Sequence, residues 1–214
     1  RLAELLDKLC KIDGFKWIRF LYAYPESITD ELIDVVKNNE KICNYFDIPL
    51  QHFSDRVLKR MNRKSDGKSI RNTIQKIRKE IPDVILRTSL IVGFPGETEE
   101  DFLDTLDLVN KVEYDSAFTF IYSPRKGTPA ATYTNQVDPD VSKRRLLTLN
   151  KAINDGFLRG NKRFENMEKS EKEFNYDSGA YVRLCCRGAE LVLQQPLGKP
   201  RLRTGAYGRR GNAQ

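Results

Sequence analysis

The run Arg87–Thr98 (RTSLIVGFPGET) limits what this chain can fold into more than any other part of the sequence. It ends an apolar stretch, passes through a Gly/Pro turn and leads into the acidic start of a helix. Such a junction places backbone N–H groups and the positive end of a helix at the carboxyl edge of a sheet, where α/β proteins bind cofactors. The run therefore predicts an α/β enzyme.

The apolar pattern predicts strands that alternate with helices. Strands are expected at 17–24, 45–51, 84–92 and 116–122, and each leads toward a segment with helical features. The near-continuous apolar run 84–92 is typical of a strand that is covered on both faces, as in parallel sheets. Consecutive βα units are parallel and right-handed, so their strand ends share one rim. Four such units are too few for a complete eightfold barrel and predict part of one.

Helix starts are predicted from capping residues. Thr29 and Ser54 are expected N-caps, and Thr98 with Asp101 forms a T-x-x-D variant of the capping box. Amphipathic helices are expected at 69–80 and at 1–12, and a long helix at about 140–164. Because the chain opens at Arg1 inside an amphipathic helix, we interpret it as a fragment.

Charge and apolar content limit the classes of protein to which this chain can belong. The formal net charge is +7, but residues 175–214 hold seven Arg and Lys against two acids, so the basic pI describes one end of the chain. No segment approaches the ~18 apolar residues of a membrane span, and none has the features of a signal peptide. These features predict a cytoplasmic protein without a membrane partner.

The cysteine pattern predicts no metal centre in this chain. The four cysteines are Cys10, Cys43, Cys185 and Cys186, and no CxxC or CxxxCxxC spacing occurs. Cys10 and Cys43 are expected to be reduced residues of the core.

Four stretches resemble the methylthiotransferase branch of radical S-adenosylmethionine enzymes. They are WIRFLYAYPESITDELID (17–34), FDIPLQHFSDRVLKRMNR (46–63), LRTSLIVGFPGETEEDF (86–102) and YDSAFTFIYSPRKGTPAA (114–131). The first two are similar to the enzymes that methylthiolate an aspartate of a ribosomal protein. The fourth is similar to the enzymes that methylthiolate N6-isopentenyladenosine in tRNA. The first subtype covers more residues and is the preferred prediction.

The resemblance implies a fold and a domain organisation. Residues 1–165 are expected to form the last four βα units of a partial TIM-like radical SAM barrel. Residues 166–214 are expected to be an atypical, poorly structured basic tail in place of the family's small β-barrel substrate-binding domain. The family binds S-adenosylmethionine and two 4Fe-4S clusters, whose ligands are expected outside this chain. The implied partners are the ribosomal protein or tRNA substrate and an external electron donor.

The resemblance also implies site residues, and none of them is expected to perform catalysis or bind a metal. Ser89, Ile91 and Gly93 occupy the G-x-I-x-G position that packs the adenine, with Ser in place of the first Gly. Because Gly93 has no side chain, it would let the backbone approach a flat ring closely. Glu97 follows in the turn and is the next candidate. Gln51 is expected at the methionine end of the cofactor, with a solvated loop residue as the alternative.

Other candidates keep two interpretations. Arg87 is either a partner of a cofactor or substrate carboxylate or half of a structural ion pair, since an unpaired charge in a buried strand is costly. Tyr24, Tyr122 and Ser123 lie at strand ends and are expected to face the substrate; the alternative for the tyrosines is that they cap the core with their hydroxyls in water. His52 is the only histidine, and a lone histidine is more often structural.

Two other classes of function compete with the enzyme. The basic tail would suit an RNA-binding module, although it lacks interleaved aromatic residues and an RNA-binding signature. A generic α/β domain with another cofactor is the second, but the sequence has neither a GxGxxG nor a GxxxxGK[ST] loop.

Overall fold

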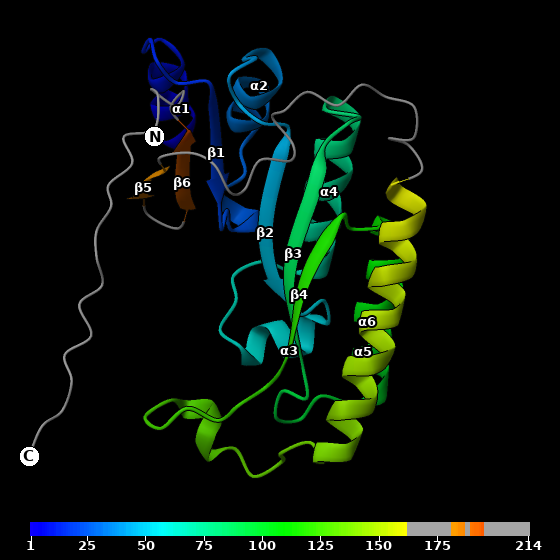
Figure 1. The fold of residues 1–214 in the computed structure, drawn as a ribbon. Coiled ribbons are helices and arrows are strands. Elements are labelled where there is room, and N and C mark those ends of the chain that lie inside the picture. Colours follow the sequence, from blue (N-terminus) through cyan, green and yellow to red (C-terminus); the bar gives the residue numbers. More distant parts are fainter. Residues whose placement is uncertain (162–180, 187–188, 195–214) are drawn as a thin grey trace, which may run out of the picture.

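The computed structural model describes residues 1–161 and two later strand segments, 181–186 and 189–194 (Figure 1). Three of the four predicted strands, β2 (Tyr45–Gln51), β3 (Ile85–Val92) and β4 (Ser116–Ile121), form one parallel sheet in the order β2-β3-β4. Helices α3 (Asp55–Arg60) and α4 (Gly67–Glu80) connect β2 to β3, and α5 (Glu99–Val112) connects β3 to β4. The predicted alternation of strands and helices is therefore confirmed here.

The remaining elements frame this sheet. Helix α1 (Leu2–Cys10) precedes strand β1 (Trp17–Leu21), and the short helix η1 (Pro25–Ser27) and α2 (Asp30–Asn38) follow it. After β4 come η2 (Pro129–Thr132) and the long helix α6 (Pro139–Asn161). None of the helices in the described part of the chain is long and apolar enough to cross a membrane.

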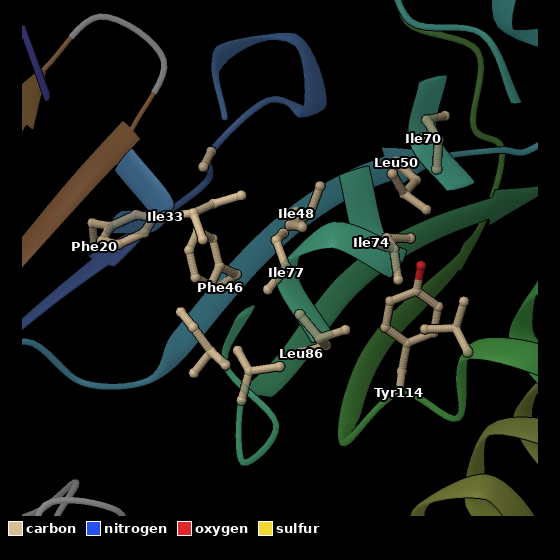
Figure 2. Close-up of a cluster of buried hydrophobic side chains, with 14 of the residues drawn as sticks. Phe20, Ile33, Phe46, Ile48, Leu50, Ile70, Ile74, Ile77, Leu86 and Tyr114 are labelled. Carbon is tan, nitrogen blue, oxygen red and sulfur yellow. The ribbon is translucent and has the colours of Figure 1, made fainter. Parts of the chain in front are cut away.

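One face of the β2-β3-β4 sheet is covered by α4, α5 and α6 (Figure 1). Phe46, Ile48 and Leu86 project from this face and are almost fully buried. They belong to the same apolar cluster as Ile74 and Ile77 of α4 (Figure 2). Alternate side chains of each strand thus pack against the helices, and the side chains between them point to the opposite face of the sheet.

Strand β1 differs from its predicted position in the parallel sheet. It pairs antiparallel with β6 (Ala189–Gln194), which in turn pairs antiparallel with β5 (Tyr181–Cys186). On its other side, Ile18 forms an isolated parallel bridge with Ile42, which precedes β2, and Ala23, which follows β1, donates from its N to Asp47 O of β2 at 2.9 Å. The pattern of an apolar strand does not specify its partner, and an unpaired edge accepts any strand that reaches it.

Strands β5 and β6 lie within residues 166–214, where the sequence predicts little regular structure. The rest of that range, including most of the basic residues, lies outside the described residues. The RNA-binding alternative that depends on these residues stays a prediction.

Two of the three predicted N-caps are confirmed. Thr29 Oγ1 accepts a hydrogen bond from Leu32 N, and Thr98 forms the full capping box with Asp101. Ser54 stands at the N-cap of α3 as predicted, but its side chain makes no capping bond there. Its Oγ instead donates to Asp101 Oδ1 at 2.5 Å, because a buried ionised carboxylate is the stronger acceptor.

Candidate functional site

The face of the sheet opposite the helices is partly exposed. In the register of the parallel ladder, Ser89 lies beside Phe118 and Ile91 beside Phe120. Phe118 is 47% exposed and Phe120 is 53% exposed, whereas Ser89 is buried. We call Arg87, Ser89, Ile91, Phe118 and Phe120 the open face. It combines two exposed aromatic rings with Ile91, Ser89 and Arg87, and it brings together three of the residues that the resemblance assigns to a cofactor.

Arg87 has a buried counter-charge on the open face. Its Nε lies 3.8 Å from Oδ1 of the fully buried Asp47, and its guanidinium carbon lies 4.2 Å from the ring centroid of Phe118. Its Nη1 also donates to the Tyr45 hydroxyl at 3.4 Å. Of the two interpretations of Arg87, the structural ion pair therefore has a partner in the structure.

Backbone strain gathers at the carboxyl ends of the first two strands. Tyr22 follows β1 with φ 58°, and Gln51 ends β2 with φ 72° after a register shift. Left-handed backbone costs a non-glycine residue about 1–2 kcal/mol and tends to occur at functional sites. Gln51 thus stands at a strained strand end, as a cofactor-facing residue would. Tyr22, which is 42% exposed, was not a candidate because sequence does not reveal φ.

The turn after β3 is held by Glu97 from inside the protein. The Glu97 carboxylate accepts hydrogen bonds from Gly93 N and from Phe94 N, the second at 3.0 Å. Arg145 of α6 places Nη1 3.2 Å from Glu97 Oε1, and both side chains are buried. The geometry therefore gives Glu97 a role in fixing the turn. Nothing in the sequence distinguishes Arg145 from the other basic residues of its helix.

Gly93 is required for a local reason. Its φ is +75°, and a Cβ at this position would collide with Oγ of Ser142 and lie 2.9 Å from Ser142 Cβ. The side of Gly93 that was expected to approach a flat ring is therefore filled by α6. Any cofactor contact at Gly93 is left to its backbone.

His52 lies beneath the same turn and is fully buried. Its Nδ1 accepts a hydrogen bond from Ser54 N at 3.1 Å, and its Nε2 lies 3.9 Å from Glu97 Oε1. This environment matches the structural interpretation of the lone histidine.

Asp101 joins α3 to the start of α5. Burial raises the pKa of this carboxyl group, but hydrogen bonds from Arg56, Ser54 and Thr98 outweigh burial and hold the pKa well below its ordinary value. The carboxylate is therefore charged at neutral pH and ties the two helix starts together.

The tyrosine candidates lie at the carboxyl edge with the turn. Tyr122 N donates to Val92 O at 2.8 Å, and the Tyr122 ring packs edge-on against Phe94 with centroids 5.0 Å apart. Tyr24 follows β1, is 40% exposed, and lies 5.6 Å from the guanidinium carbon of Arg63. Ser123 is exposed. Tyr122 thus lies against the turn after β3, and Tyr24 lies against Arg63.

The chain belongs to the radical SAM superfamily, because the model of that superfamily matches residues 1–109, half of the chain. This membership implies S-adenosylmethionine and an iron–sulfur cluster. Among the residues that the structure describes, no group of three or more His, Cys, Asp or Glu side chains could hold a metal ion. The described residues thus do not fit a cluster. The open face does fit a flat nucleobase, since it offers two exposed aromatic rings beside the half-buried Ile91.

Within this superfamily, the chain is similar to curated proteins that are methylthiotransferases. The "Ribosomal protein uS12 methylthiotransferase RimO" of Alkaliphilus oremlandii is 62% identical over 146 residues, or 68% of this chain and 33% of the relative. Its counterpart in Clostridioides difficile is 54% identical over 149 residues, or 70% of this chain and 34% of the relative. The "tRNA-2-methylthio-N(6)-dimethylallyladenosine synthase" of Clostridium botulinum is 46% identical over 163 residues, or 76% and 36%. This chain spans about a third of each relative.

Solved structures confirm the predicted fold class. Coproporphyrinogen III oxidase (HemN) of Escherichia coli, a radical SAM enzyme, matches with a TM-score of 0.53 at 20% identity, covering 75% of this chain and 36% of HemN. The methyltransferase TsrM of Kitasatospora setae matches with a TM-score of 0.50 at 13% identity, covering 60% and 26%. Identities this low support the fold alone.

Proposed function

We propose that this chain is the cofactor-positioning part of a methylthiotransferase. The enzyme would replace a hydrogen of an unactivated C–H bond with a methylthio group, and its substrate would be an aspartate of ribosomal protein uS12. The observation that carries the proposal is the open face, whose exposed side chains lie beside Ser89 and Ile91, opposite the face of the sheet that α4, α5 and α6 cover (Figure 1).

The roles of the residues follow from their places on the sheet. Ser89 and Ile91 would pack the adenine, with Phe118 and Phe120 extending the apolar surface. Gln51, at the strained end of β2, would hold the methionine end through its amide. Arg87 would border the site while Asp47 offsets its charge.

The turn and the tyrosines complete the proposed site. Gly93 and Glu97 would shape the turn beside the cofactor, and Tyr24, Tyr122 and Ser123 would face the substrate. When bound, S-adenosylmethionine supplies the radical that activates the C–H bond. The chain's own residues orient the cofactor and shield it from water.

Parts outside this chain complete the enzyme in this proposal. Two 4Fe-4S clusters would be bound by residues of a longer protein, and an external donor would supply electrons. A ribosomal substrate would place the enzyme in the cytoplasm.

The choice of uS12 over tRNA rests on the degree of similarity. The two uS12 relatives are 62% and 54% identical to this chain, and the tRNA-modifying relative is 46% identical. N6-isopentenyladenosine in tRNA is the alternative substrate.

A segment-exchange enzyme tests the proposal. The matching segment of this chain replaces its counterpart in the full-length Alkaliphilus oremlandii relative, so that the cluster-binding parts are present. After anaerobic reconstitution with iron and sulfide, which also provides the sulfur, S-adenosylmethionine and a reductant are added. Mass spectrometry of uS12 is then expected to show a gain of one sulfur atom and one CH₂ group on an aspartate. The unmodified parent enzyme is the positive control.

The same reaction is run on tRNA that carries N6-isopentenyladenosine. Methylthiolation of the tRNA without modification of uS12 would transfer the proposal to the alternative substrate. An exchange enzyme that binds S-adenosylmethionine but modifies neither substrate, beside an active parent, would contradict the proposed function.

A further inference from the structure

The loop 123–138, which follows β4, is fastened to the turn Gly93–Gly96 by a side chain from α3. We propose that Arg60 is a positioning residue that latches this loop, and that the latch controls how the substrate is engaged and leaves cofactor binding unchanged. The substrate part of this inference rests on the proposed function. The latch itself rests on contacts within the chain.

Arg60 joins three segments that are distant in the sequence. Its Nε donates to Pro95 O at 3.1 Å, and its Nη2 donates to Asn135 Oδ1 at 3.1 Å. Its guanidinium carbon also lies 4.9 Å from the ring centroid of Tyr133. A planar guanidinium directs its donors in a fixed fork while its flat face stacks on an aromatic ring, whereas an ammonium group has no flat face to stack.

The loop also bonds directly to the turn beneath the guanidinium. Gly96 N donates to Asn135 O at 2.7 Å, and the Phe94 ring lies edge-on to Tyr133 at 6.5 Å between centroids. A Cβ at Gly96 would collide with Asn135 Nδ2 and lie 3.2 Å from Arg60 Cζ. The glycine therefore allows the loop to lie directly on the turn.

The position of the latch points to the substrate. Arg60 lies on α3 and is not part of the open face, so its loss removes no side chain from the surface proposed for the adenine; its bond to the turn is to the carbonyl oxygen of Pro95, on the loop side. The loop that it holds extends from the carboxyl end of β4, where it carries the exposed residues Ser123, Arg125 and Lys126 (Figure 1). These residues lie where a macromolecular substrate would approach the carboxyl edge of the sheet.

Hydrogen exchange on the 214-residue chain tests the latch. In the Arg60→Ala variant, the Gly96 amide is expected to exchange about tenfold faster, because its acceptor on the loop is no longer held in place. Amides of the β2–β3 ladder should keep their rates. The Arg60→Lys variant should lie between the two, and the control Lys59→Ala, which alters an exposed neighbour on α3, should match the wild type. Equal Gly96 exchange in Arg60→Ala and wild type would overturn the latch.

Kinetics of the segment-exchange enzyme test the role in substrate engagement. Arg60→Ala is expected to raise KM for uS12 by about tenfold while the rate of S-adenosylmethionine cleavage without uS12 stays unchanged. A slower cleavage with an unchanged KM would overturn that role. If the segment-exchange enzyme with wild-type Arg60 modifies no substrate, the proposed function fails. The hydrogen-exchange rate of the Gly96 amide in the 214-residue chain still decides whether the latch exists.

Discussion

The Gly93→Ala variant of the 214-residue chain is expected to lose about 3 kcal/mol of unfolding free energy. The left-handed backbone at φ +75° costs a residue with a Cβ about 1–2 kcal/mol, and the collision with Ser142 adds an overpacking cost of about 1–3 kcal/mol. Urea unfolding followed by circular dichroism measures the loss.

Gly127→Ala is the matched control for that experiment. Gly127 has φ +86°, but nothing lies within 4 Å of the position that its Cβ would take, so only the backbone cost of about 1–2 kcal/mol is expected. Adding Ser142→Gly to Gly93→Ala should recover the difference, which a double-mutant cycle isolates. Equal losses in the two alanine variants would show that α6 does not press on the turn.

The Glu97→Ala variant is expected to lose about 3–5 kcal/mol, because it leaves Arg145 buried without its nearest buried counter-charge and leaves the Gly93 and Phe94 amides without an acceptor. Glu99 Oε2 still lies 3.0 Å from Arg145 Nη2, which favours the lower end of that range. The same unfolding measurement applies.

Two variants calibrate the Glu97 result. Glu97→Gln keeps an oxygen for the two amides and should lose only about 1–2 kcal/mol. Asp104→Asn alters an exposed acid of α5 and should change stability by less than about 0.5 kcal/mol. If Glu97→Ala were as stable as Asp104→Asn, the carboxylate would not be what holds the turn.

Patterns over a few consecutive residues correctly predict the parts of the fold that depend on neighbours in the sequence. Thr98 and Asp101 cap α5 as predicted, since a capping box is complete within four residues. The apolar run 84–92 became the central strand of the sheet. The antiparallel partner of β1 could not be predicted in this way, because β6 lies far along the chain and pairing depends on which strand reaches the edge.

The candidate site was predictable only in part, for a similar reason. The resemblance located Ser89, Ile91 and Gly93 on one strand and its turn, but the groups that act on that turn come from helix α6. Neither Ser142 beside Gly93 nor Arg145 beside Glu97 belongs to a local pattern. Phe118 and Phe120 do form a local pattern, since aromatic residues two apart in a strand share one face.

The affinity of the segment-exchange enzyme for S-adenosylmethionine, measured by calorimetry, tests the open face most directly. Ile91→Ala is expected to weaken binding by about tenfold, the effect of removing one aliphatic contact from a buried ligand. Leu103→Ala, which alters a half-exposed residue of α5, should leave affinity unchanged. Equal affinities of Ile91→Ala and the unsubstituted enzyme would contradict the assignment of the cofactor to this face.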